Sequence, residues 1–186
     1  HAPTTMETSP LVLRPLSLDD EPSFREAVAE FKAEQPPWDF SLGWAETEDF
    51  SEYLQKLDNI ARGVNLPAGL VPASFYVGVV GGAVVGRVSL RHELNEFLAR
   101  IGGHVGYGVR PSQRRRGYAT AMLRQALPLC AARGITHALI TCDVDNEGSR
   151  RVIERCGGVF EGLTADPTQT VQKRRYWVKT TGAVRG

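Results

Sequence analysis

The pattern that most restricts the fold lies between residues 104 and 156, where two short apolar runs alternate with two helical patterns. The apolar runs predict strands at residues 104–109 and 137–142. The segments that follow predict helices at 117–132 and 146–156. A strand, a helix and a second strand in this order form a parallel pair joined by a crossover. We therefore expect an α/β protein.

The sequence on either side of this region predicts antiparallel neighbours. Two alternating runs joined by Gly81 and Gly82 have the signature of a hairpin. The other predicted elements are strands at 11–16, 74–80, 83–90, 159–162 and 174–179, and helices at 17–31 and 46–60. Together they predict a mixed, mostly antiparallel sheet of about seven strands with helices against it.

Length and charge limit the organisation and the partners. A chain of 186 residues is the size of one domain, which we place at 11–180, with a tail at 181–186. Residues 1–10 are interpreted as a disordered segment or a remnant of cloning. The 22 Lys and Arg nearly balance the 21 Asp and Glu, so no overall field favours nucleic acid, and we expect no nucleic-acid partner.

Cysteine usage predicts a reducing compartment, and hydropathy predicts no membrane-spanning helix. Cys130, Cys142 and Cys156 are odd in number and widely spaced, which predicts neither a disulfide framework nor a metal site. No window approaches the ~20 apolar residues of a membrane-spanning helix. We therefore expect a cytoplasmic protein with no metal and no membrane partner. Whether the chain forms a homodimer stays open.

The segment from Arg114 to Thr120 carries three successive arginines and then Gly117, and it joins a predicted strand to a predicted helix. A helix N-terminus presents unpaired backbone N–H groups and a partial positive charge, so it binds anions. Gly117 would let a ligand approach the backbone closely. An arginine run is also typical of solvated surface, and that alternative stays open. The nucleotide-binding loop with Gly-Lys-Ser/Thr is absent, and Gly106 and Gly108 lack the third glycine of a dinucleotide fingerprint.

The run Arg114-Arg115-Arg116-Gly117-Tyr118-Ala119 resembles the acyl-CoA turn of the GCN5-related N-acetyltransferases (GNAT), Gln/Arg-x-x-Gly-x-Gly/Ala. Asn146, which opens a helix that ends at Glu154-Arg155-Cys156-Gly157, is similar to the second signature of that family. His104-Val105-Gly106-Tyr107 stands where the ribosomal-protein N-terminal acetyltransferases carry Glu-Ile-Gly-Tyr.

The resemblance implies a GNAT fold in which the central parallel strands splay apart and acetyl-CoA lies between them. Asn146 also fits a plain helix N-cap. The residues that the resemblance assigns to acetyl-CoA are Tyr107, Val109, Arg114, Arg115, Arg116, Gly117, Tyr118, Ala119, Thr120, Asn146 and Ser149.

For the chemistry, the resemblance implies direct attack of a primary amine on acetyl-CoA in a ternary complex. An amine with a pKa of about 10.4 needs a base, a water relay or desolvation at neutral pH. His104 is the first candidate base and Glu93 the second. The alternative for His104 is a structural role, in which a strand histidine only forms hydrogen bonds with neighbouring groups. Ile153 stands where many members have a tyrosine acid, so an alternative function is a non-catalytic acyl-CoA-binding sensor or scaffold.

Other tyrosines are candidates for the acid, and Cys142 is interpreted as inert packing. The tyrosines considered are Tyr107, Tyr118 and Tyr176.

The acceptor side is predicted from the acidic and aromatic segment at residues 34–52. Acids beside aromatic rings favour a cationic amine, whereas a helix with its acids in water has the same pattern. We prefer the solvated reading for Glu48 and Glu52, and keep Trp38, Asp39 and Trp44 as acceptor candidates. The acceptor itself is left as a small-molecule or peptide amine.

Overall fold

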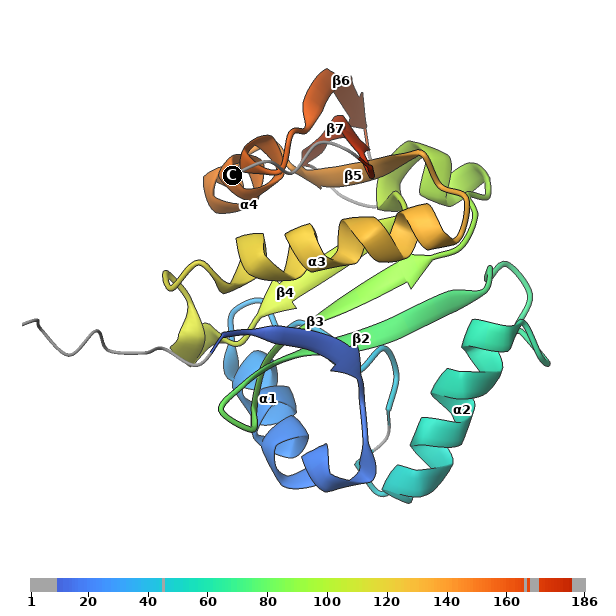
Figure 1. The fold of residues 1–186 in the computed structure, drawn as a ribbon, viewed down its shortest axis with the longest axis vertical. Coiled ribbons are helices and arrows are strands. Elements are labelled where there is room, and N and C mark those ends of the chain that lie inside the picture. Colours follow the sequence, from blue (N-terminus) through green and yellow to red (C-terminus); the bar gives the residue numbers. More distant parts are fainter. Residues whose placement is uncertain (1–9, 45, 166, 168–170, 182–186) are drawn as a thin grey trace, which may run out of the picture.

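Seven strands form two antiparallel sheets, with α3 lying between them in the view of Figure 1. The computed structural model describes residues 10–44, 46–165, 167 and 171–181. The expected segment 1–10 and the tail 181–186 therefore lie almost wholly outside the described residues. The first sheet has the order β1 (Val12–Pro15), β2 (Ala73–Val80), β3 (Ala83–Arg91) and β4 (Val105–Val109), and the second has the order β5 (His137–Asp143), β7 (Gln172–Lys179) and β6 (Val159–Ala165).

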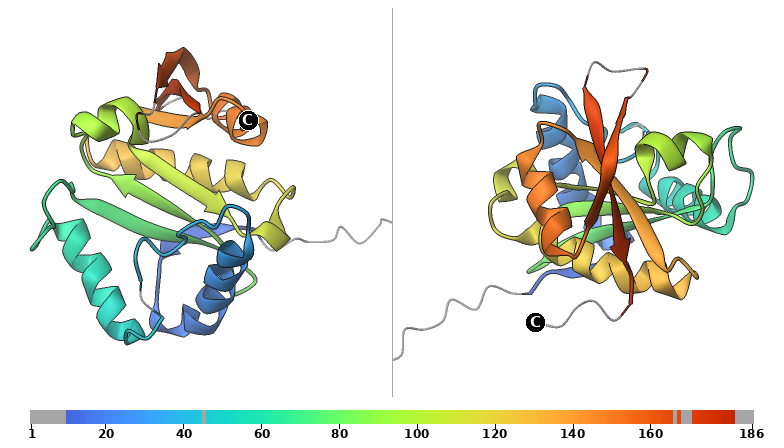
Figure 2. Two further views of the ribbon diagram at one scale, coloured as in Figure 1. Left: turned by 180° about the vertical axis from the view of Figure 1, so that it is seen from behind. Right: turned by 90° about the horizontal axis from the view of Figure 1, so that it is seen from above.

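Helices cover both faces of the four-stranded sheet. Figures 1 and 2 show α1 and α2 on one face of this sheet and α3 on the other. None of the helices in the described ranges is long and apolar enough to span a bilayer. The long helices are α1 (Glu21–Ala33), α2 (Phe50–Arg62), α3 (Tyr118–Ala132) and α4 (Glu147–Arg155), and the short helical turns are η1 (Leu18–Asp20), η2 (Leu98–Gly102) and η3 (Pro111–Gln113).

The predicted α/β fold with seven strands is confirmed, and its elements differ from the predictions mainly at their ends. The hairpin joins β2 and β3 at Gly81 and Gly82. The helix expected from residue 46 begins at Phe50, because the Asp49 carboxylate caps it by accepting the Ser51 N–H at 2.8 Å. The turns η2 and η3 were not predicted, since neither contains a full helical period of apolar residues.

The predicted central pair, β4 and β5, meets at one end. The His104 N–H donates to the Leu139 carbonyl at 2.7 Å, just before β4 begins. In the described part of the chain β4 and β5 are not joined in one sheet, so the strands separate beyond this point. Their separation divides the expected single sheet into two.

Two hydrophobic cores lie between these layers. One lies between α3 and the strands, where Met122, Leu123 and Leu127 are fully buried. The other lies beneath α1 and α2 and is largely aromatic. Phe24 is at its centre, with five other rings whose centroids lie 5.3–6.2 Å from its own. Burial of each such side chain stabilises the fold by roughly 1.5–3 kcal/mol.

Candidate functional site

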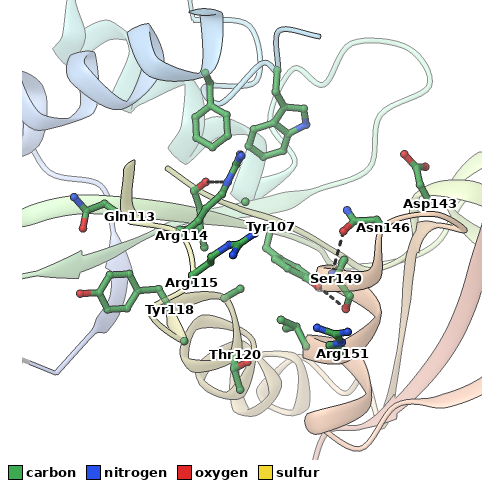
Figure 3. A pocket seen from close by; sticks show the side chains of 18 of the residues that line it. Tyr107, Gln113, Arg114, Arg115, Tyr118, Thr120, Asp143, Asn146, Ser149 and Arg151 are labelled. Carbon is green, nitrogen blue, oxygen red and sulfur yellow. Dashed lines mark hydrogen bonds between the residues drawn. The ribbon is translucent and has the colours of Figure 1, made fainter. Parts of the chain in front are cut away.

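A cavity of about 780 Å³ opens where β4 and β5 have separated. Its lining comes from β4, from the turn before α3, from the start of α4, and from the segment that follows α1. Figure 3 shows side chains from these segments converging on it. The site is therefore assembled from parts of the chain that are far apart in sequence.

The turn before α3 lines this cavity and has backbone N–H groups without acceptors in the part of the chain described. Arg115 has φ 64° and Gly117 has φ 79°, and such left-handed residues curl a turn so that successive N–H groups converge. Among the described residues, the N–H groups of residues 115–117 have no hydrogen-bond acceptor. Helical geometry leaves those of residues 118–120 without one as well. A Cβ on Gly117 would meet no atom within 4 Å, so the backbone there is open. These features describe an anion site.

Two carboxylates, Glu30 of α1 and Glu34 directly after its end, hold this turn in place. Glu30 accepts hydrogen bonds from Arg110 and from the Ser112 N–H, the latter at 3.0 Å. The Glu34 carboxylate accepts hydrogen bonds from both terminal nitrogens of Arg114, at 2.6 and 2.8 Å. The Arg114 Nε donates to the Val109 carbonyl at 3.1 Å. Two of the four arginines around the turn therefore position it.

The cations that remain available to a ligand come from two elements. Arg115 lies on the turn, and Arg151 and Arg155 lie on α4, and all three line the cavity. None of the three is ion-paired with another residue in the described ranges. Arg116 is exposed and does not line the cavity. The sequence interpretation missed Arg151 and Arg155, although their spacing of four on a helix that opens at Asn146 places them on one face.

A hydroxyl pair lies between β4 and α4. The Tyr107 hydroxyl is 2.7 Å from Ser149 Oγ, and the Asn146 side chain caps α4 by accepting the Ser149 N–H at 3.1 Å (Figure 3). Burial raises the pKa of Tyr107, while the hydrogen bond with Ser149 opposes this rise. The phenol is therefore protonated at neutral pH and can donate a hydrogen bond. Burial also raises the pKa of Cys142, which disfavours a thiolate.

Of the cofactor residues predicted from sequence, all except Arg116 line the cavity. The predicted base candidates lie elsewhere. His104 is buried at the junction of β4 and β5, where its Nδ1 accepts the Leu139 N–H at 2.9 Å. Burial, followed by the charge of Arg91, lowers the pKa of His104, so its ring is neutral. Glu93 is exposed beyond the end of β3.

The three acceptor candidates are not brought together. Trp38 lines the cavity, and Asp39 is exposed with its carboxylate 3.2 Å from the Ser41 hydroxyl. Trp44 is buried in the aromatic core, stacked on Tyr53 at 5.3 Å.

Most of the acids in the predicted acceptor segment are committed to other partners. Glu34 pairs with Arg114, Glu46 with Lys32 and Glu48 with Lys56. Ile153, at the position of the expected tyrosine acid, is fully buried.

Comparisons with known proteins agree with this arrangement. Residues 10–159 match the family model described as an acetyltransferase (GNAT) domain. The chain is similar in structure to the Salmonella typhimurium acetyl transferase that modifies the N-terminal serine of ribosomal protein L7/L12, with 19% identity, a TM-score of 0.65, and coverage of 92% of this chain and 96% of that one.

Two further structures are similar over most of the chain. Mycobacterium smegmatis RimJ in complex with CoA-disulfide is 19% identical with a TM-score of 0.65, covering 91% of this chain and 81% of that one. The putative acetyltransferase yncA of Salmonella typhimurium with acetyl-CoA is 12% identical with a TM-score of 0.60, covering 94% and 96%. No curated protein sequence matches the chain significantly. At these identities the structures establish the shared fold.

Proposed function

The chain belongs to the acetyltransferase (GNAT) family and is an acetyl-CoA-dependent N-acetyltransferase, and from that premise we propose that it acetylates the primary amine of a peptide or protein in a ternary complex. Two kinds of support favour a peptide acceptor. The similar structures include enzymes that act on the N-terminus of a ribosomal protein. The cavity is also open, which suits an extended chain reaching in from solvent.

The observation that carries the proposal is the row of N–H groups at residues 115–120, which faces the cavity between the separated strands. In the proposed complex these groups hold the pyrophosphate of acetyl-CoA, because a helix N-terminus offers donors and positive potential together. Arg115, Arg151 and Arg155 supply charge for the phosphates. The pantetheine arm lies along β4 beside Val109 and Tyr107, which places the thioester between β4 and β5.

The amine attacks the thioester carbonyl, and the carbon–sulfur bond then breaks. Backbone N–H groups of β4 near Tyr107 stabilise the negative oxygen of the intermediate. The hydroxyl pair of Tyr107 and Ser149 delivers a proton to the leaving sulfur. His104 and Glu93 stay predictions for the base. In the observed conformation His104 Nδ1 accepts the Leu139 N–H, so this hydrogen bond must break before Nδ1 can accept a proton from the amine. A water relay to solvent is the competing route for that proton.

The function is tested by incubating the protein with acetyl-CoA and a panel of peptides with free or blocked N-termini. We expect thiol release together with a mass increase of one acetyl group on the free peptides alone. Initial rates at varied concentrations of both substrates should give intersecting reciprocal plots, as direct transfer requires. Parallel plots, or loss of turnover in Cys142→Ala, would indicate an acyl-enzyme instead.

A second candidate function is a non-catalytic acyl-CoA-binding sensor or scaffold. The buried Ile153, in place of the expected tyrosine acid, favours it. Binding of coenzyme A without acetylation of any amine in the panel would support this candidate over the enzyme.

A further inference from the structure

A buried arginine, Arg87, and a half-buried one, Arg91, lie on the face of β3 that points away from α3. Strand alternation places Arg87, Ser89 and Arg91 on this face, while Val88 and Leu90 join the core against α3. Arg87 is only 3% exposed. Charged residues at such positions are rare unless a partner neutralises them.

The neighbouring strand β4 has no side chains on this face. Its glycines, Gly106 and Gly108, are opposite Ser89 and Arg87 in the register. A Cβ on Gly106 would lie 3.1 Å from Arg91 Nη1, and a Cβ on Gly108 would lie 2.6 Å from the ring of Trp38. Arg91 and Trp38 therefore occupy the space above bare β4 backbone, the strand beside which we place the thioester.

Trp38 separates Arg87 from the cavity. The guanidinium carbon of Arg87 is 4.1 Å from the centroid of the Trp38 ring. Trp38 also lines the cavity together with Gly108. One aromatic ring thus lies between a buried cation and the space where the amine must attack.

In the part of the chain that the structure describes, neither arginine forms an ion pair with a carboxylate. Among the described residues, nothing accepts a hydrogen bond from the buried Nε and Nη1 of Arg87. Arg91 donates only to backbone carbonyls, those of Gly102 and Gly103, at 3.2 and 3.5 Å. Burial, and then the charge of Arg91, lower the pKa of Arg87 to about 9 against the opposing effect of the Asp39 carboxylate, so its guanidinium stays protonated at neutral pH. The face therefore holds two positive charges.

Three other arginines are paired with carboxylates, whereas the half-buried Arg174 lies over the Phe160 ring and has no ion pair among the described residues. Arg110 pairs with two glutamates of α1, Arg114 pairs with Glu34, and Arg14 pairs with Asp20. Stacking on Trp38 explains the orientation of Arg87, yet it supplies no acceptor for its nitrogens and does not explain a second cation nearby. An anionic ligand would supply both the acceptors and the missing charge.

We propose that Arg87 and Arg91 form an anion subsite of the acceptor pocket, which the ligand reaches when the Trp38 ring moves aside, and that the acetylated amine belongs to a molecule with a carboxylate close to that amine. The inference rests on the proposed function and specifies its acceptor. A guanidinium and a carboxylate form paired hydrogen bonds, which orient the acceptor as well as bind it.

The carboxylate has two potential sources, and matched acceptors distinguish them. To test for an acidic side chain, we compare two peptides that differ only in carrying Asp or Asn at the second residue. To test for a free C-terminal carboxylate close to the amine, a dipeptide is compared with its C-terminal amide. A hydrogen bond to a charged group contributes about 1.5–3 kcal/mol, so we expect kcat/KM to favour the carboxylate member of one pair by about tenfold or more.

Variants assign the preference to the subsite. In Arg87→Met the ratio of the two kcat/KM values should fall to about one, while Arg62→Met, an exposed arginine of α2, should keep the wild-type ratio. The melting temperature of Arg87→Met should equal or exceed that of the wild type, because the change removes an unpaired buried charge. If this variant does not fold, Arg91→Met provides the same comparison.

The outcomes separate this inference from the proposed function. Equal rates on both members of both pairs, or an unchanged ratio in the folded arginine variants, would overturn the anion subsite and leave the acetyltransferase proposal intact. A protein that binds coenzyme A and acetylates none of these acceptors would contradict the proposed peptide acceptor and the subsite together.

Discussion

Gly117 is the residue on which cofactor binding depends most directly. Its φ of 79° is unfavourable for other residues, and its missing side chain keeps the turn open. Gly117→Val should therefore weaken coenzyme A binding by about tenfold or more, which is ~1.4 kcal/mol, as measured by calorimetry. Gly134→Val is the matched control, because Gly134 has φ 80°, similarly open surroundings, and a place outside the cavity lining.

Both valine variants carry the same backbone strain, about 1–2 kcal/mol, so both should lose stability alike. Only the Gly117 variant should lose affinity. Equal affinities in the two variants would show that the turn does not contact the ligand.

His104 makes stability depend on pH. Its pKa is lower in the folded protein than the ordinary value of about 6.5, so below that pH the unfolded chain binds more protons. Stability should then fall as the pH drops below about 6.5, until the pH passes the pKa of the folded state. His104→Asn, whose amide oxygen can still accept the Leu139 N–H, should reduce this fall in urea unfolding at pH 7.5, 6.5 and 5.5.

A second histidine, His92, also contributes to this measurement. Burial also lowers the pKa of His92, so part of the pH dependence should persist in His104→Asn. The same His104 variant tests the base: loss of turnover and of the acidic limb of the rate profile would support that role, and full turnover would exclude it.

At the scale of elements, α1 determines the shape of the phosphate turn. Glu30→Ala removes the acceptor for Arg110 and for the Ser112 N–H, so we expect a loss of about 1–3 kcal/mol in stability and weaker coenzyme A binding. Glu26→Ala is the control, since Glu26 contacts the same Arg110 but is 67% exposed. If the two variants behave alike, α1 does not support the turn.

Helices and strands could be predicted from the sequence where the pattern that specifies them lies within a few neighbouring residues. The hairpin at Gly81-Gly82 and the helix after Gly117 follow from turn chemistry and apolar spacing. The separation of β4 from β5 was implied by family resemblance alone, because it depends on contacts between distant segments. The ion pair of Glu34 with Arg114 was not predicted for the same reason, because the two residues lie 80 positions apart in the sequence.

For the molecule as a whole, two sheets that meet near His104 and then separate create a space that neither would have alone. The turn before α3 lines that space on one side, and Gly108 of β4 lines it on another. Sequence identified the first of these features through its glycine and arginines. It missed the cations Arg87 and Arg91, although a charged residue inside an apolar strand was a visible signal.

A crystal structure of the protein with acetyl-CoA bound tests the central claim most directly. The account predicts the pyrophosphate within hydrogen-bond distance of the N–H groups of residues 115–120, and the thioester between β4 and β5 beside Tyr107. A nucleotide bound elsewhere on the protein, with the turn before α3 left empty, would contradict it.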